Sequence, residues 1–241
     1  MKQNLISSHY DTKEVVADYI EYAKYGLWNS EKVILESLLQ QLPQNLTILD
    51  IGCGAGRTSF ALAKWLPNAK IDAIDISPAM INQCVAQNKF QNLHFEVADI
   101  SKYPLKSKYD LIFFSFNGIT NNTYQAELEA IFTNVHWMLK DRNSIFLFTV
   151  HDMFSNPEFE HFWKEIKQVD KLELFSDEKI LTNQNHSIIK NRFFTKNDIY
   201  QIAKLFNFKV ILERKRDENS EFEWVKTLST PVIFYAFSKL E

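Results

Sequence analysis

The sequence predicts an α/β protein with a doubly wound, mostly parallel sheet that ends in an antiparallel C-terminal hairpin. From Leu46 onward, short apolar runs alternate with amphipathic stretches of helical period, which is the pattern of repeated strand–helix–strand units. The last two apolar runs are joined by polar sequence without an obvious helix, which favours a hairpin. With 241 residues, 46% of them apolar, the chain can bury one full core.

Nothing in the chain marks a domain boundary. There is no internal repeat, no low-complexity stretch and no linker rich in proline, glycine or serine. We therefore expect a single domain over residues 1–241. Its sections, in order, are a helical N-terminal extension (1–45), a core (46–151), an insertion (152–194) and a helix followed by the hairpin (195–241).

The N-terminal extension holds an amphipathic segment over Glu14–Gln41. The helical pattern is broken at Tyr25–Trp28, where Gly26 disfavours a continuous helix. The core then alternates strand and helix candidates, and Ser77 with Pro78 gives one of its helices a clear start. In chain order these candidates are Thr47–Ile51, Arg57–Leu66, Lys70–Ile76, Pro78–Phe90, Leu93–Ala98, Asp110–Ser115, Tyr124–Leu139 and Ser144–His151.

The insertion over residues 152–194 is rich in aromatic side chains, so we expect a lid and not a disordered loop. After it, Thr195 and Asp198 form a capping box before the helical run Ile199–Phe206. The apolar runs Phe208–Leu212 and Val232–Phe237 then supply the two strands of the hairpin.

Glycine use points to a ligand-binding turn. The chain has five glycines, and three of them fall within Asp50–Gly56, directly after the first strand candidate. A tight glycine turn between a strand and a helix lets the backbone approach a ligand, and the helix start offers unpaired N–H groups. We expect Asp50 to leave a carboxylate at the rim of this site.

The spacing of the glycines separates two kinds of nucleotide-binding turn. Nicotinamide-binding proteins use G-x-G-x-x-G, whose third glycine would fall on Arg57. The pattern here is D-x-G-x-G-x-G, from Asp50 to Gly56. It resembles the first motif of class I S-adenosylmethionine-dependent methyltransferases, whose core is Rossmann-like. Together with the acids that follow, the resemblance covers about residues 47–151.

The resemblance implies S-adenosylmethionine as cofactor and a role for each matching position. Asp75, at the end of the second strand, would accept hydrogen bonds from both ribose hydroxyls. Asp99, after the third strand, would read the adenine amino group between Ile76 and Ile100. The residues expected to bind the cofactor are Asp50, Gly52, Cys53, Gly54, Gly56, Asp75, Ile76, Met80, Asp99, Ile100, Ser115, Phe116 and Asn117.

The implied reaction is in-line displacement of the methyl group onto a nitrogen or oxygen of a small-molecule acceptor. A general base is needed only if the acceptor arrives protonated. His151 is a candidate because it ends the fifth strand, although a histidine merely hydrogen-bonded there is the simpler explanation. Tyr25 is a second catalytic candidate, because aromatic residues of the N-terminal segment cover the ligands in small-molecule members of the family.

Composition bears on partners and location. The formal net charge is -3 and no basic run occurs, so we expect no nucleic-acid partner. The first residues lack the features of a signal peptide and no window is apolar enough to span a bilayer, so we expect a cytoplasmic protein without membrane contact. The two cysteines, Cys53 and Cys84, do not make a metal site.

Three other functions stay open at this point. A protein or RNA methyltransferase would share the core and differ only in what covers the pocket. A dinucleotide-dependent oxidoreductase could use Asp75 for a ribose, although Asp50 and Arg57 fit it poorly. A non-catalytic protein that only binds S-adenosylmethionine would keep the same motifs. The acceptor and the oligomeric state are not predicted by the sequence.

Overall fold

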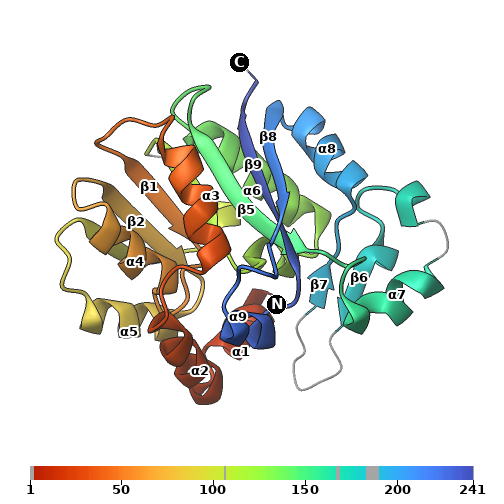
Figure 1. Ribbon diagram of the computed structural model, residues 1–241, viewed down its shortest axis with the longest axis horizontal. Coiled ribbons are helices and arrows are strands. Elements are labelled where there is room, and N and C mark those ends of the chain that lie inside the picture. Colours follow the sequence, from red (N-terminus) through yellow and green to blue (C-terminus); the bar gives the residue numbers. More distant parts are fainter. Residues whose placement is uncertain (1–2, 106, 167–168, 183–189, 241) are drawn as a thin grey trace.

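The protein is built on one seven-stranded sheet with the strand order β3-β2-β1-β4-β5-β9-β8 (Figure 1). The computed structural model describes residues 3–105, 107–166, 169–182 and 190–240. Its strands are β1 (Thr47–Ile51), β2 (Lys70–Asp75), β3 (Leu93–Val97), β4 (Leu111–Phe114), β5 (Ile145–His151), β8 (Phe208–Lys215) and β9 (Val232–Lys239). Five strands pair in parallel, and β9 is antiparallel to both of its neighbours. The predicted mostly parallel fold with an antiparallel C-terminal hairpin is confirmed.

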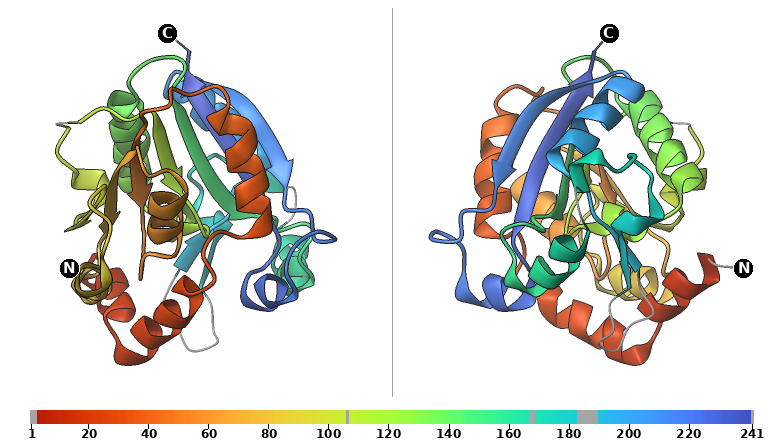
Figure 2. Two further views of the ribbon diagram at one scale, coloured as in Figure 1. Left: turned by 60° about the vertical axis from the view of Figure 1, so that its left-hand side comes forward. Right: turned by 90° about the vertical axis from the view of Figure 1, so that its right-hand side faces the viewer.

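Helices cover both faces of this sheet, so its strands are apolar on both sides. One buried cluster joins the sheet to α3 (Asn29–Leu39), α4 (Arg57–Trp65) and α5 (Pro78–Gln87). A second cluster on the opposite face joins it to α6 (Gln125–Met138) and α8 (Lys196–Leu205). The two views of Figure 2 show these layers on either side of the sheet. The ends of the strands are therefore the part of the sheet left for a ligand.

The strand order reverses beside β1, which pairs with β2 on one side and with β4 on the other. At such a switch point the following connections run to opposite faces of the sheet, and a crevice opens at the carboxyl ends of the strands. The glycine turn follows β1 at this point. The fold thus places Gly52–Gly56 at the position where open α/β sheets bind ligands.

Two helix starts follow the predicted capping residues. Ser77 Oγ accepts a hydrogen bond from Met80 N at 3.1 Å, and Thr195 with Asp198 forms a reciprocal capping box. The helix α9 (Glu223–Leu228) was not predicted; it lies between β8 and β9, where the polar sequence showed no helical pattern. With six residues it is too short to show a helical period.

The N-terminal extension forms three helices, which are α1 (Gln3–Tyr10), α2 (Lys13–Ala23) and α3. The break predicted at Tyr25–Trp28 separates α2 from α3. Both Figure 1 and Figure 2 place α1 and α2 at the end of the sheet where the parallel strands finish. α3 is fastened to α4 by a buried ion pair in which two guanidinium nitrogens of Arg57 lie 2.6 and 2.7 Å from the carboxylate of Glu31.

The insertion after β5 packs around its own aromatic cluster. It contains α7 (Glu160–Glu165) and a small antiparallel sheet of β6 (Ile180–Thr182) and β7 (Lys190–Arg192). Buried Met153, Val169 and Phe193 form the centre of the cluster. Residues 167–168 and 183–189 of the predicted lid lie outside the described part of the chain.

Replacing Arg57 with Met is expected to lower the free energy of unfolding by about 3–5 kcal/mol, because the carboxylate of Glu31 would be left buried without a counter-charge. The exposed pair of Lys32 and Glu36 on α3 gives the control, since Lys32→Met should cost less than about 1 kcal/mol. Urea denaturation of both variants measures the difference. Equal losses would contradict a special role for the buried pair.

Candidate functional site

The turn after β1 strongly favours glycine at three positions. Gly52, Gly54 and Gly56 have φ values of +64°, +54° and +87°, a region that side chains disfavour. A Cβ atom on Gly54 would lie 2.9 Å from the ring of Tyr19, and one on Gly52 would lie 3.0 Å from the ring of Phe114. The loop is therefore packed tightly between the N-terminal helices and the end of β4.

Asp75 holds this turn from the end of β2. One carboxylate oxygen accepts a hydrogen bond from Gly54 N at 2.8 Å, and the other accepts one from Ser77 N at 2.9 Å. Burial raises the pKa of Asp75, while these two N–H groups favour its charged form. A carboxylate has about four acceptor positions. Asp75 can therefore hold the backbone and still accept hydrogen bonds from a ligand.

Asp50 does not lie at the rim, which corrects the expectation from the sequence. It is fully buried, and its Oδ2 accepts hydrogen bonds from Thr58 Oγ1 and Ser59 Oγ, both at 2.5 Å. Burial raises its pKa to about 6. Asp50 thus ties the first turn of α4 to β1 from beneath the glycine loop.

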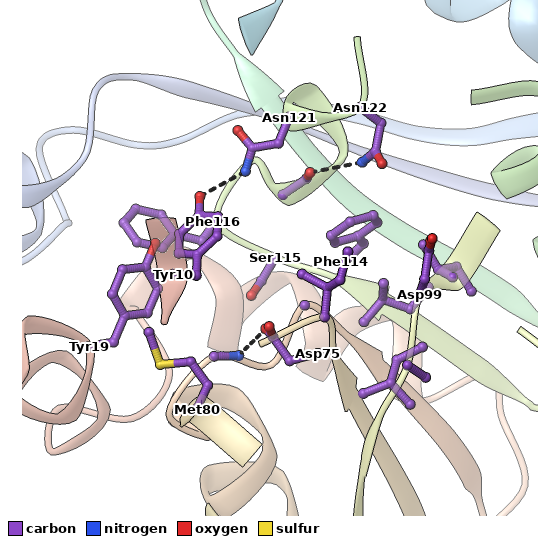
Figure 3. Close-up of a pocket in the computed structure, with 18 of the residues that line it drawn as sticks. Tyr10, Tyr19, Asp75, Met80, Asp99, Phe114, Ser115, Phe116, Asn121 and Asn122 are labelled. Atoms are coloured by element: carbon purple, nitrogen blue, oxygen red, sulfur yellow. Dashed lines mark hydrogen bonds between the residues drawn. The ribbon is translucent and has the colours of Figure 1, made fainter. Parts of the chain in front are cut away.

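A cavity that is partly open to solvent lies above the turn. Nine of the residues expected to bind the cofactor line it: Gly52, Gly54, Asp75, Ile76, Met80, Asp99, Ile100, Ser115 and Phe116. Figure 3 shows Asp75 and Met80 along one side, with Asp99 across the cavity from Tyr10 and Tyr19. Cys53 lines a smaller adjoining cavity, and Asp50, Gly56 and Asn117 are not among the residues lining either.

Asp99 lies at the start of a short 3-10 turn after β3. Its Oδ1 accepts hydrogen bonds from Ser101 N at 2.9 Å and Ser101 Oγ at 2.7 Å, and Lys102 Nζ lies 3.1 Å from Oδ2. Ile76 and Ile100 line the same cavity. An acidic group and two apolar side chains thus lie together, as the reading of a purine base requires.

The segment after β4 is bent by two residues with positive φ that are not glycines, Phe116 (+52°) and Asn117 (+57°). Such conformations cost energy and are often found at functional sites. Two hydrogen bonds hold the bend, from Asn117 N to Thr149 Oγ1 at 2.8 Å and from Thr120 Oγ1 to Asn117 O at 2.7 Å. Asn117 therefore supports the bend, while Phe116 lines the cavity.

Two tyrosines that the sequence analysis did not single out complete the cavity. Tyr10 comes from α1 and Tyr19 from α2, with ring centroids 5.8 Å apart. Asn121 Nδ2 donates a hydrogen bond to Tyr10 Oη at 2.9 Å. The short helix α1 is held to α5 because Asp11 Oδ1 accepts hydrogen bonds from Ser77 Oγ at 2.6 Å and Ala79 N at 3.1 Å.

Tyr25 lies outside the cavity. Its side chain is 55% exposed and stacks on Trp224 of α9, with ring centroids 4.2 Å apart. The expectation that Tyr25 covers the ligands does not match this position. The prediction located the break between two helices correctly, but tyrosines from α1 and α2 line the cavity in its place.

His151 ends β5, as predicted, but is not among the residues lining the cavity. Its Nδ1 lies 2.9 Å from Thr230 Oγ1 and 3.3 Å from Asn117 Nδ2, and its ring packs against Phe159 and Phe193 of the insertion. Burial lowers its pKa to about 4, so the imidazole is neutral at pH 7. A role as general base stays a prediction.

The fold and the cavity define a Rossmann-like protein with a nucleoside site at the switch point of its sheet. A family model described as a methyltransferase domain matches residues 42–209, and the chain belongs to this family. A solved S-adenosylmethionine-dependent methyltransferase from Clostridium acetobutylicum has a similar fold, with a TM-score of 0.60, 18% identity, and coverage of 86% of this chain and 89% of that one. A methyltransferase from Methanosarcina mazei gives a TM-score of 0.64 at 16% identity, covering 85% and 97%.

Curated relatives are methyltransferases as well. The chain is 38% identical over 110 residues to malonyl-[acyl-carrier protein] O-methyltransferase 1 of Ilyobacter polytropus, covering 44% of this chain and 37% of the relative. It is 27% identical over 194 residues to the malonyl-[acyl-carrier protein] O-methyltransferase of Bacillus anthracis, covering 77% and 65%. In both matches the chain spans less than two thirds of the relative's length.

The chain thus carries a methyltransferase domain. Its cavity fits S-adenosylmethionine, because a glycine-lined floor, two acids after successive strands and two apolar walls line it together. Among the residues that the structure describes, no helix has the length and apolarity needed to cross a membrane. The same described residues contain no group of three or more His, Cys, Asp or Glu side chains suited to a metal ion.

Replacing Gly54 with Ala should weaken binding of S-adenosylhomocysteine, the demethylated cofactor, by at least about tenfold, because the new methyl group would push against Tyr19. Gly26→Ala is the matched control. Gly26 also has a positive φ (+67°), but a Cβ there meets only Ala61 at an ordinary 3.5 Å. Both variants should lose about 1–2 kcal/mol of stability. Calorimetric titration should find weaker binding in Gly54→Ala alone, and unchanged binding in that variant would contradict the packing described.

His151 should make stability depend on pH. Because burial lowers its pKa from 6.5 to about 4, the unfolded chain binds a proton there that the folded protein excludes between these pH values. Its contribution to stability is therefore full above pH 6.5 and is lost as the pH falls toward 4. His151→Gln should show a flatter decline in this window than the wild type, measured by denaturation at several pH values. His94→Gln, at an exposed position on β3, should not.

Proposed function

We propose that the protein transfers the methyl group of S-adenosylmethionine to a nitrogen or oxygen atom of a small-molecule acceptor bound in the described cavity. The observation that supports this most is the cover that α1 and α2 form over the carboxyl ends of the strands. Tyr10 and Tyr19 line the same cavity as Asp75 and Asp99. A cavity covered by two helices suits a small acceptor better than the surface of a macromolecule.

Residues at the carboxyl ends of β1, β2 and β3, or directly after them, would hold the cofactor. Gly52 and Gly54 give it a backbone floor, Asp75 would accept from the ribose hydroxyls, and Asp99 from the adenine amino group. The cofactor supplies a methyl group on a positively charged sulfur. The acceptor's lone pair forms a bond to the methyl carbon while the carbon–sulfur bond breaks onto sulfur, and the acceptor's proton leaves to water.

The remaining lining residues would position the acceptor. Phe114, Phe116 and Tyr19 present aromatic rings, and Asn121 with Tyr10 presents polar groups. Burial raises the pKa of Tyr10 to about 12, so its hydroxyl stays protonated at neutral pH and orients ligands without serving as a base. Alignment of two reactants and exclusion of water are the main contributions a protein makes to such a displacement.

A second candidate is an acceptor attached to a carrier protein. It is favoured by the similarity to malonyl-[acyl-carrier protein] O-methyltransferases. Such an acceptor would reach the cavity through its opening to solvent. The two candidates share the cofactor site and differ in what surrounds the methyl acceptor.

The reaction is tested by supplying S-adenosylmethionine with an isotopically labelled methyl group together with an unfractionated cell extract that holds metabolites, protein and RNA. Label in one or more small molecules, released along with S-adenosylhomocysteine, would support the proposal. Label only in protein or RNA would replace it with a macromolecular acceptor. Cofactor binding without any labelled product would point to a non-catalytic binding protein.

Asp75→Asn should reduce affinity for S-adenosylhomocysteine by at least about tenfold, because an amide cannot accept from Gly54 N, Ser77 N and a ligand as a carboxylate does. Asp72→Asn is the control, since Asp72 lies on the same strand and accepts from Tyr109 Oη outside the cavity. Calorimetry measures both affinities. Similar affinities for the two variants would argue against Asp75 as a cofactor ligand.

A further inference from the structure

The charges that line the cavity are all of one sign. Among its described lining residues, Asp75, Asp99 and Glu127 are acidic, and none is Lys, Arg or His. Glu127, in the first turn of α6, raises the number of acids beyond the two assigned to the cofactor. A positively charged cofactor suits these surroundings. An acceptor that carries a negative charge does not.

The negative potential extends to the tyrosines that would contact the acceptor. The pKa values of Tyr10 and Tyr19 are raised first by burial, and the charge of Asp75 raises both further. Asp75 thus disfavours a second negative charge at either phenol. An acceptor carboxylate placed between these rings would meet the same repulsion.

Two cations near the cavity, Lys102 and Arg57, are already paired with the carboxylates of Asp99 and Glu31. Arg57 lines the smaller adjoining cavity, which shares Tyr19, Gly52, Ser115 and Phe116 with the main one. Its guanidinium binds both carboxylate oxygens of Glu31 and also donates to Gly26 O at 2.9 Å. Glu31 is itself buried and accepts from Trp28 N at 2.9 Å, which fixes the start of α3. A carboxylate could not take Arg57 without displacing Glu31.

From these contacts we infer that the acceptor carries no negative charge at the atoms that enter the cavity, and that a carboxylate acceptor is excluded. This inference rests on the proposed function and specifies its substrate class. An uncharged acceptor finds hydrogen-bonding groups in Tyr10 and Asn121 and apolar contact with Phe114 and Phe116. A carboxylate would lose its water, and the one cation it would meet, the sulfonium of the cofactor, is outnumbered by the three acids that line the cavity. The malonyl group in the names of the relatives belongs to this excluded class.

The test uses two bisubstrate analogues of S-adenosylhomocysteine in which a nitrogen replaces sulfur and carries a short tail. The tails have the same length and end in a carboxylate or in a carboxamide. Calorimetry on the full chain compares both analogues with S-adenosylhomocysteine. The carboxamide should bind at least about tenfold more tightly than the carboxylate. Equal affinities, or tighter binding of the carboxylate, would overturn the inference.

Two variants at Asn121 show whether charge causes the preference for the carboxamide analogue over the carboxylate analogue. Asn121→Lys adds a cation beside Tyr10 and should reduce or reverse the preference, whereas Asn121→Leu should keep it. A preference unchanged in Asn121→Lys would count against an electrostatic origin.

Two further results separate the inference from the proposed function. If S-adenosylhomocysteine binds but neither tailed analogue does, the acceptor does not enter this cavity and the inference fails. If S-adenosylhomocysteine itself does not bind, the proposed function fails. Formation of a methyl ester on malonyl-[acyl-carrier protein] by the wild type, with saturable kinetics, would also overturn the inference.

Discussion

The carboxylate of Asp75 is the interaction on which the site depends. It accepts from Gly54 in the turn after β1 and from Ser77 at the start of α5, so one side chain fixes the connections that leave two neighbouring strands. Both hydrogen bonds offset the cost of burying the charge. The hydrogen bond from Gly54 N gives the glycine turn a fixed acceptor at the end of the neighbouring strand. The floor of the cavity is therefore set by the end of β2 as much as by the glycines.

The N-terminal helices are hydrogen-bonded to the start of α5, next to Asp75. Ser77 Oγ donates to Asp11, while Ser77 N donates to Asp75, so a single residue links the cover of the cavity to its floor. The pair of Arg57 and Glu31 makes a second link, from α4 to α3. Tyr10 is next to Asp11 in the chain, so the first link sets where α1 brings its ring.

Local sequence patterns predicted the floor of the site. The positions of Tyr10 and Asp50 depend on contacts formed only in the folded chain. Strand ends, the glycine turn and the caps at Ser77 and Thr195 are set by residues close in sequence, and the structure confirms these elements. The position of Tyr10 depends on Asn121 and its helix on the start of α5, far away in the chain. Asp50 turns inward because Thr58 and Ser59 offer hydroxyl groups beneath the loop. No spacing rule in the sequence reveals such partners.

Cofactor and acceptor specificity are carried by different parts of the chain. The family match begins at residue 42, after the helices that supply Tyr10 and Tyr19. The family match therefore reports mainly on the floor, where the acids proposed to hold the cofactor lie. Those same acids would set the potential that the acceptor meets, because Asp75, Asp99 and Glu127 line one cavity. To these acids the described cover of this chain adds aromatic rings and an amide, which supply no counter-charge to a carboxylate.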